Sequence, residues 1–382
     1  MKRSFSSVRV TGAALALIAA TYGLVRLAFG LVLPDAQRDL GFDDALGGAI
    51  SSGGSGLYVV AALVGFVAAA RAPRAAVIAA SASAALGAAG MAMAPDVVVF
   101  AAAAVLGSAG AGLASPAVVA VLKSHPATRG DARAQTIANS GTGPGLVLAG
   151  ALALVLLPEW RVAWAIAAVC SALAGVAVVA LSRGISTAGD RMPLPPRSWF
   201  ARHVRPLTAA LLFGAGSAAV WTFGRTQLVD AGLDETLSVV AWIGLGAGGA
   251  SVALTARLLA TWGPRRAWAI TVVLAAGATV ALPLTASGIV GAVVVAAVFG
   301  WAYTAATGAL IAWTTDLDAE RVAAGTALLF VTLVLGQGVG AAVLGLLVTG
   351  VGGWAAFAVG AGVCAAAAVF AGRRGARRPV AV

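Results

Sequence analysis

Charged residues are scarce in this chain of 382 residues. Only 10% are Asp, Glu, Lys or Arg, whereas 60% are hydrophobic. A water-soluble domain carries about 25% charged residues, because it needs them to cover its surface. This shortage excludes an ordinary soluble domain and indicates that lipid surrounds most of the folded chain.

Cysteine and histidine are almost absent, with two residues of each. Cys170 and Cys364 fall in separate apolar stretches, and His125 and His203 fall in expected loops. Such isolated side chains form neither a disulfide framework nor a metal site. The chain also lacks a nucleotide-binding loop and any nucleophile accompanied by histidine or paired acids at membrane depth. We therefore expect no enzyme activity, no ATP-driven work, no cofactor and no metal.

Long apolar runs occupy most of the chain. Crossing about 30 Å of hydrocarbon takes about 20 residues, and such spans are helical because lipid offers no partner to open backbone groups. The predicted spans are 10–33, 46–70, 75–93, 97–122, 134–157, 162–182, 206–229, 237–260, 267–286, 289–313, 322–348 and 354–372. The sequence thus predicts an all-α integral membrane protein with twelve transmembrane helices.

The chain also repeats itself after about 191–195 positions, which marks a duplicated unit. Asp43 returns as Asp234, and Pro73 returns as Pro264. Two six-helix units that face each other form a transporter, with the substrate held where the units meet. We expect two pseudo-symmetric bundles and a connection, divided as 1–182, a cytoplasmic linker at 183–205, and 206–382.

The net charge of +11 comes mainly from one set of loops. With both termini in the cytoplasm, the cytoplasmic loops and termini hold every Lys and Arg except Arg26, Arg38, Arg161 and Arg225. This is the positive-inside bias, so the charge encodes topology and gives no reason to expect a nucleic-acid partner. A composition rich in Arg, Ala and Gly is typical of a high-GC bacterial genome. We therefore expect a monomer in the bacterial plasma membrane, with the lipid bilayer and a small-molecule substrate as its partners.

Two loops carry related basic sequences. The loop after the eighth span contains Gly263-Pro264-Arg265-Arg266, and the loop after the second contains Arg71-Ala72-Pro73-Arg74. Together with the duplicated spans and the long central loop, these sequences resemble those of transporters of the major facilitator superfamily. The resemblance covers the whole chain and implies a gating role for Arg71, Arg74, Gly263, Arg265 and Arg266.

This resemblance is incomplete at one position in each half. Members of the family place an acid in these loops that helps to lock the cytoplasmic side through charge pairing. Ala69 and Ala260 stand there in this chain. The resemblance therefore does not extend to that lock.

The fifth span contains Gly143-Pro144-Gly145, which resembles the Gly-Pro motif of the family's drug/proton antiporters. Val147-Leu148 replaces the closing glycine pair of that motif. The resemblance implies a gating role for Gly143 and Pro144. It also keeps proton-driven drug efflux open as a function.

Ionisable residues inside a span are costly and point to function. Arg26 lies in the first span and Arg225 late in the seventh, each one helical turn after an aromatic residue, Tyr22 and Trp221 respectively. A guanidinium binds carboxylate or phosphate through paired hydrogen bonds. In the resembling family the first and seventh helices line the central cavity, and some members that carry organic anions place an arginine on each. These four residues are therefore predicted to bind an anionic substrate.

Other interpretations of these residues stay open. Counted from the cytoplasmic side, Arg225 lies deep enough to reach the outer surface instead, and each aromatic ring can simply pack on its arginine. Asn139, Tyr303 and Gln337 lie near the middle of three further spans and complete the predicted cavity. Their alternative role is hydrogen bonding between helices, worth about 0.6 kcal/mol each.

Acidic residues are missing from the interior of every predicted span. All 14 fall in expected loops or at span ends, with Asp35 and Asp230 at the outer rim. Intramembrane acids form the proton relays of pumps and transporters. The sequence therefore favours uniport, exchange, or co-transport in which the substrate itself carries the proton.

Two functions remain after these exclusions. The first is secondary active or facilitated transport of a small organic solute, an amphipathic organic anion, by alternating access. The alternative is multidrug or secondary-metabolite efflux by proton antiport, supported by the Gly-Pro motif and by the aromatic candidates Tyr22, Tyr58, Trp221 and Tyr303. A sensor or scaffold is disfavoured by the duplication.

Overall fold

The computed structural model describes residues 2–129, 131–182 and 195–372. In these ranges every regular element is helical, and twelve helical segments are long and apolar enough to cross a membrane. The predicted all-α membrane fold is therefore confirmed.

The first half of the chain forms one bundle. Its elements are α1 (Lys2–Ile18), η1 (Ala19–Leu27), α2 (Phe29–Leu40), α3 (Asp44–Arg71), α4 (Pro73–Ala92), α5 (Val97–Ser124), α6 (Ala132–Asn139), α7 (Thr142–Leu156) and α8 (Trp160–Leu181). The first three elements continue one another as the first membrane segment, and α6 and α7 together form the fifth.

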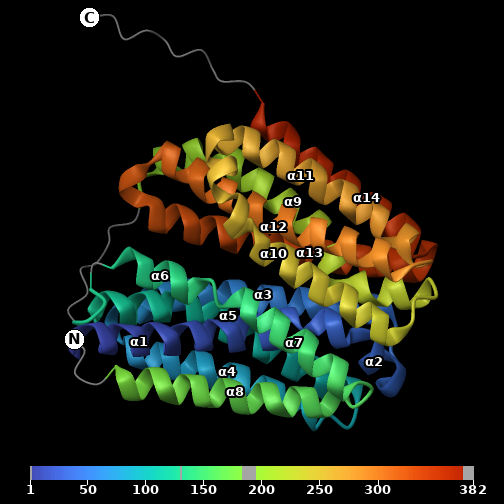
Figure 1. Cartoon of the computed structure of the whole chain (residues 1–382), viewed down its shortest axis with the longest axis horizontal. Coiled ribbons are helices and arrows are strands. Elements are labelled where there is room, and N and C mark those ends of the chain that lie inside the picture. Colours follow the sequence, from blue (N-terminus) through green and yellow to red (C-terminus); the bar gives the residue numbers. More distant parts are fainter. Residues whose placement is uncertain (1, 130, 183–194, 373–382) are drawn as a thin grey trace, which may run out of the picture.

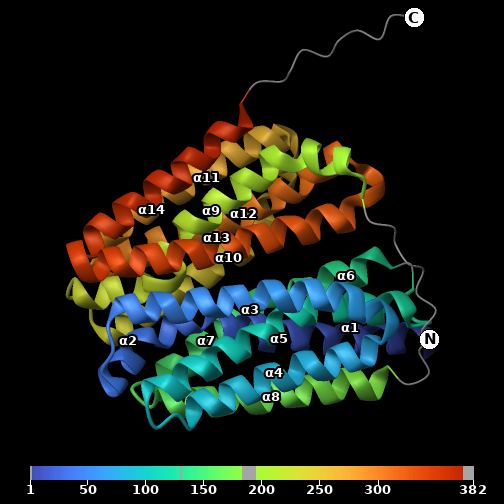
Figure 2. The ribbon, with the colours of Figure 1, turned by 180° about the vertical axis from the view of Figure 1, so that it is seen from behind.

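The second half forms the other bundle. Its elements are α9 (Arg197–Asp230), α10 (Glu235–Trp262), α11 (Pro264–Ala281), η2 (Leu282–Thr285), α12 (Ile289–Leu317), η3 (Ala319–Arg321), α13 (Val322–Val351), α14 (Gly353–Ala368) and η4 (Val369–Ala371). Figure 1 shows this bundle, in yellow to red, lying against the blue-to-green first bundle, and Figure 2 shows the same two layers from behind.

We call the end of the molecule that contains the N-terminus the proximal end. The distal end, at the opposite side of Figure 1, contains the turn between α2 and α3. Loops 93–96, 157–159 and 231–234 also lie at the distal end, because successive membrane helices run antiparallel.

The duplicated landmarks have the same structural role in each bundle. The side chain of Asp43 accepts a hydrogen bond from Leu46 N and caps α3, and Asp234 caps α10 in the same way. Pro73 and Pro264 are the first residues of α4 and α11, where a missing N–H leaves no bond unmade. The repeat in sequence is thus a repeat of helix starts.

Glycine brings the two bundles into backbone contact near the distal end. A Cβ atom on Gly48 of α3 would lie 2.3 Å from the carbonyl oxygen of Ala341 on α13. One on Gly30 of α2 would lie 2.1 Å from the carbonyl oxygen of Trp221 on α9. No side chain fits at either position, so these glycines fix how closely the bundles approach.

The first membrane segment continues well beyond its predicted end at residue 33. Pro34 lies inside α2, and the helix ends only at Leu40, where Gly41 adopts a φ of 67°. Asp35 is consequently inside a helix, and only 3% of it is exposed. Pro34 is accommodated within α2, so the helix does not end at this residue.

Two further boundaries differ from the prediction at the start of the second bundle. Helix α9 begins at Arg197, so residues 197–205 of the expected linker are helical, while residues 183–194 lie outside the described residues. His203 is therefore in a helix and not in a loop. It is buried, stacks on Trp199 and bonds to the hydroxyl of Thr314.

Candidate functional site

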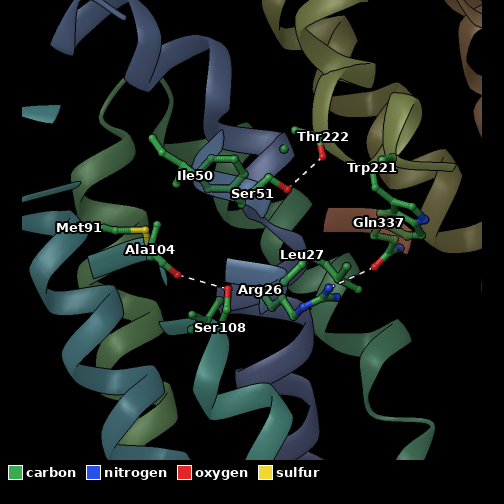
Figure 3. Close-up of a pocket in the computed structure, with 15 residues that line it drawn as sticks. Arg26, Leu27, Ile50, Ser51, Met91, Ala104, Ser108, Trp221, Thr222 and Gln337 are labelled. Carbon is green, nitrogen blue, oxygen red and sulfur yellow. Dashed lines mark hydrogen bonds between the residues drawn. The ribbon is translucent and has the colours of Figure 1, made fainter. Parts of the chain in front are cut away.

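A cavity lies between the two bundles, and Figure 3 shows the side chains that line it. Helices η1, α2, α3, α4 and α5 form one wall, and α9 and α13 form the other. The empty space is about 580 Å³, part of which is open to solvent. Its polar side chains are Arg26, Ser51, Ser55, Ser108, Trp221, Thr222 and Gln337.

Arg26 provides the cationic group of this cavity. Its Nη2 donates a hydrogen bond of 3.1 Å to Oε1 of Gln337 in the other bundle, as Figure 3 shows. The guanidinium carbon also lies 4.7 Å from the ring centre of Tyr58. None of the ion pairs in the described part of the chain includes Arg26. Its charge is therefore met only by neutral groups.

The helix that carries Arg26 is locally widened. Residues Ala19–Leu27 form a π-helix, in which hydrogen bonds join residues five apart and which occurs frequently at functional sites. Tyr22 and Arg26 both belong to it. Gly23 packs on α7 so closely that a Cβ would lie 2.4 Å from Cα of Gly145. This contact holds the widened segment against the fifth membrane segment.

Three tyrosine hydroxyls lie near Arg26 and Gln337, and that of Tyr303 is bonded to Gln337. Gln337 donates from Nε2 to the hydroxyl of Tyr303, 3.0 Å away on α12. Below the guanidinium, the hydroxyls of Tyr22 and Tyr58 lie 2.9 Å apart. The ring of Trp221 is 5.1 Å from that of Tyr303. Of the residues predicted from sequence, Arg26, Trp221 and Gln337 line the cavity. Tyr303 contacts Gln337 and Trp221 without lining it, and Tyr22 bonds to Tyr58 without lining it.

The remaining predicted residues of the fifth segment lie elsewhere. Asn139 is exposed at the end of α6 and does not line the cavity. Gly143 has open space around it, whereas its neighbours Gly141 and Gly145 lie against the backbone of the first segment. The close packing of this motif therefore belongs to Gly141 and Gly145.

Arg225 is fully buried, but it does not line the cavity. It forms an ion pair with Asp35 across the two bundles, and its Nη1 donates a hydrogen bond of 2.7 Å to the carbonyl oxygen of Leu31. Its Nε donates to the hydroxyl of Ser238 at 2.9 Å. The two duplicated arginines are thus in different environments, since one has a carboxylate partner and the other has none.

The pairing of Asp35 with Arg225 was not predicted from the sequence. The available signal was spacing, because Leu31, Asp35 and Arg38 share one helix face if the helix continues past Pro34. Arg38 pairs both with Asp35 and with Glu235 of the second bundle.

Further bonds between the bundles also lie toward the distal end. The hydroxyls of Ser51 and Thr222 are 3.2 Å apart, and Ala45 N donates to Oγ1 of Thr349 at 3.0 Å. At the proximal end, the described ion pairs include none of the predicted gating arginines, Arg71, Arg74, Arg265 and Arg266. Arg265 instead lies over the ring of Trp313 within its own bundle. The bonds that fasten the bundles therefore concentrate at the distal side of the cavity.

Comparison with known proteins gives a family and a fold. The sequence model of the Major Facilitator Superfamily matches residues 15–318. The fold is similar to the crystal structure of the nucleoside transporter NupG, with a TM-score of 0.77 and 16% identity over 96% of this chain and 98% of that chain. Curated protein sequences gave no significant match.

Two other solved structures have the same architecture. A POT family transporter in complex with 5-aminolevulinic acid has a TM-score of 0.74 and 12% identity, over 95% of this chain and 94% of that one. A bacterial homologue of the human lysosomal transporter Spinster, in an inward-facing and unoccupied conformation, has a TM-score of 0.67 and 18% identity, over 97% and 94%. At such identities the likeness shows the fold alone.

Proposed function

The chain belongs to the Major Facilitator Superfamily, and from this premise we propose that it carries a small amphipathic organic anion across the membrane by alternating access. The observation that carries this proposal is Arg26, a cation in the cavity between the bundles without a carboxylate partner among the described residues. An anionic substrate supplies the missing charge.

The electrostatics of the cavity favour an anion. A guanidinium stays charged at every physiological pH, and Arg26 is half-buried beside neutral groups, which is costly for a charge. A carboxylate or phosphate forms two parallel charge-assisted hydrogen bonds with it. Gln337 now occupies one donor of Arg26 with its amide oxygen, and a substrate anion would replace that oxygen.

The rest of the lining supports a substrate with an apolar body. Phe29, Ile50, Met91 and Trp221 contribute apolar surface, while serine and threonine hydroxyls are placed among them. Small-molecule sites combine such surface with a few polar groups that orient the ligand. An amphipathic anion satisfies both parts of this lining.

The fold alone does not determine which substrate is carried. The similar structures are named as a nucleoside transporter and as a POT transporter bound to 5-aminolevulinic acid, so this architecture accommodates chemically different solutes. The preference for an anion rests on Arg26 and not on these relatives.

We also propose that both termini are cytoplasmic, as the positive-inside bias indicates. The distal end is then the outer end, and the bonds across it correspond to a state closed to the outside. Transport would require these bonds to break when the cavity opens outward, and the proximal end to close.

Substitution of Arg26 tests the proposed cargo. In proteoliposomes given a panel of radiolabelled amphipathic carboxylates and neutral or cationic dyes, Arg26→Gln should abolish carboxylate uptake, and Arg26→Lys should weaken it strongly because a lysine lacks the paired donors. Arg161→Gln is the matched control, since Arg161 pairs with Asp39 inside the first bundle. Carboxylate uptake unchanged in Arg26→Gln, or dye transport lost equally with it, would refute the proposal.

Efflux by proton antiport is the second candidate function, and a different observation favours it. Asp35 is a buried carboxylate that bonds across the bundles to Arg225, and titratable groups buried at membrane depth serve proton relays. Dye efflux driven by an imposed pH gradient, and lost in Asp35→Asn, would support antiport over the anion uniport or exchange proposed above.

A further inference from the structure

A second hollow lies at the distal end, again between the two bundles. Its walls are the end of α2 and the turn to α3 on one side, and the end of α9 with Thr349 of α13 on the other. About 640 Å³ of space is empty there, including space open to solvent. The hollow is separate from the cavity of Arg26, because the two have no lining residue in common.

The hollow carries unbalanced negative charge. Asp43 and Asp44 contribute from the first bundle and Asp230 from the second. None of these three acids takes part in an ion pair of the described residues, and Arg38 beside them already pairs with Asp35 and Glu235. Asp230 is also the last residue of α9, where the helix dipole disfavours an anion.

A buried hydroxyl independently points to a ligand. Thr226 is one of the lining residues, only 5% of it is exposed, and its Oγ1 has no hydrogen-bond partner. Buried polar side-chain atoms are nearly always paired in native structures. A ligand that donates a hydrogen bond inside the hollow would satisfy this oxygen.

We propose that the distal hollow binds an organic ammonium ion, best a linear diamine whose two ammonium groups reach the acids of opposite bundles. Ammonium groups supply the positive charge that the acids lack and an N–H donor for Thr226. Asp43 and Asp44 each already accept one hydrogen bond, from Leu46 N and from Gln37 Nε2. The chain between them packs on the apolar part of the wall, which Pro34, Phe42 and Val229 provide.

A bare metal ion fits this hollow less well. In the part of the chain that the structure describes, no three His, Cys, Asp or Glu side chains converge closely enough to hold one. The acids come from opposite bundles, and a flexible organic cation can span the hollow between them. Because both bundles contribute acids, an occupant clamps the distal end shut, and under the proposed transport function it therefore acts as an inhibitor.

Thermal unfolding of the full chain in a neutral maltoside detergent tests the site without anionic lipid. We expect 1,4-diaminobutane to raise the unfolding temperature, and n-butylamine or sodium chloride at matched ionic strength to raise it much less. Asp230→Asn should remove the diamine shift. Asp96→Asn should keep it, because Asp96 caps α5 at the same end but lines neither cavity.

Calorimetric titration of the diamine gives the same comparison as an affinity. We expect binding at least about tenfold weaker in Asp230→Asn and in Thr226→Val, which corresponds to about 1.4 kcal/mol. Asp44→Asn serves as a second acid variant if Asp230→Asn does not fold. These readouts need no transport substrate, so they can fail while the proposed function stands.

Three results would overturn the proposal. The first is an equal diamine shift in the wild type and Asp230→Asn. The second is a rise in unfolding temperature with butylamine as large as that with the diamine, because binding would then not require two ammonium groups that bridge the bundles. The third is a calcium or magnesium shift that depends on Asp230 while the diamine gives none, since the hollow would then be a metal site.

Discussion

Arg26 and Arg225 show how one residue type takes two roles. Both come from duplicated helices, but Arg225 is fully buried, whereas Arg26 is half-buried and lines the cavity. Arg225 has Asp35 as its partner and becomes part of the structure, whereas Arg26 has only Gln337 and the ring of Tyr58. The presence or absence of one carboxylate decides which arginine remains free to bind an anion.

We expect Gln337→Glu to weaken substrate uptake, because the new carboxylate would compete with the substrate for Arg26. The new carboxylate would sit 3.1 Å or less from Nη2 of Arg26, in the place of the present amide oxygen, and would neutralise the guanidinium before a substrate arrives. We expect uptake of any accepted carboxylate to require at least about tenfold more substrate. Concentration-dependent proteoliposome uptake measures this, and Gln227→Glu, outside the cavity lining, is the control. An unchanged half-saturation would argue against Arg26 as the anion site.

Removal of one partner from the buried pair should cost more stability than removal of both. Arg225→Met leaves the carboxylate of Asp35 buried and facing only Arg38, and such a loss costs about 3–5 kcal/mol. Arg225→Met with Asp35→Leu removes both charges and should unfold at a higher temperature than Arg225→Met alone. Thermal unfolding in detergent decides this, and a double variant less stable than the single one would contradict it.

At the scale of elements, glycine positions set the contacts between bundles. Gly48→Ala would push Cβ to within 2.3 Å of the carbonyl oxygen of Ala341, so α3 and α13 must separate. We expect the distal ends to move apart. Spin labels at Met93 and Leu284, which are exposed at the distal ends of the two bundles, measure the distance between them.

Gly56→Ala is the matched control for this experiment. It lies in the same helix, α3, and a Cβ there meets nothing within 4 Å. The label distance should stay at the wild-type value in this variant. A lengthened distance in both variants would mean that helix flexibility, and not the contact with α13, is responsible.

The sequence alone was enough to predict those elements that depend on residues close together in the chain. Spans follow from apolar length, and Asp43, Asp234, Pro73 and Pro264 mark helix starts because caps act on the next few residues. The π-helix was not predictable, since its widened turns depend on the packing of Gly23 against Gly145.

The candidate site was predictable only in part for a similar reason. Arg26 and its aromatic neighbour could be found because a charge in an apolar run is conspicuous. Asp35 was hidden by Pro34, which normally ends a helix, and its partner lies in the other bundle, 190 positions away. Asn139 lies at the break between α6 and α7, and no spacing rule locates such a break within a glycine-rich run.

At the scale of the whole molecule, the bundles are fastened on one side of the cavity. The bonds of Arg38, Ala45 and Arg225 join the bundles there, whereas none of the ion pairs among the described residues joins the bundles at the proximal end. Alternating access then depends on how easily the distal bonds break. This asymmetry makes the distal contacts the place to arrest the cycle.

A reversible cross-link between Ala45→Cys and Thr349→Cys should stop transport. Ala45 N and Oγ1 of Thr349 are 3.0 Å apart across the bundles, so cysteines there can be joined when Cys170 and Cys364 are replaced by serine. Oxidation would hold the distal end closed, and a protein that works by rocking its bundles must then lose uptake and regain it on reduction. Asp39→Cys with Arg161→Cys is the control, because that pair lies within the first bundle and should leave uptake intact when joined. If the cross-linked Ala45→Cys, Thr349→Cys protein took up substrate as fast as it does after the cross-link is reduced, the substrate would cross without separation of the distal ends.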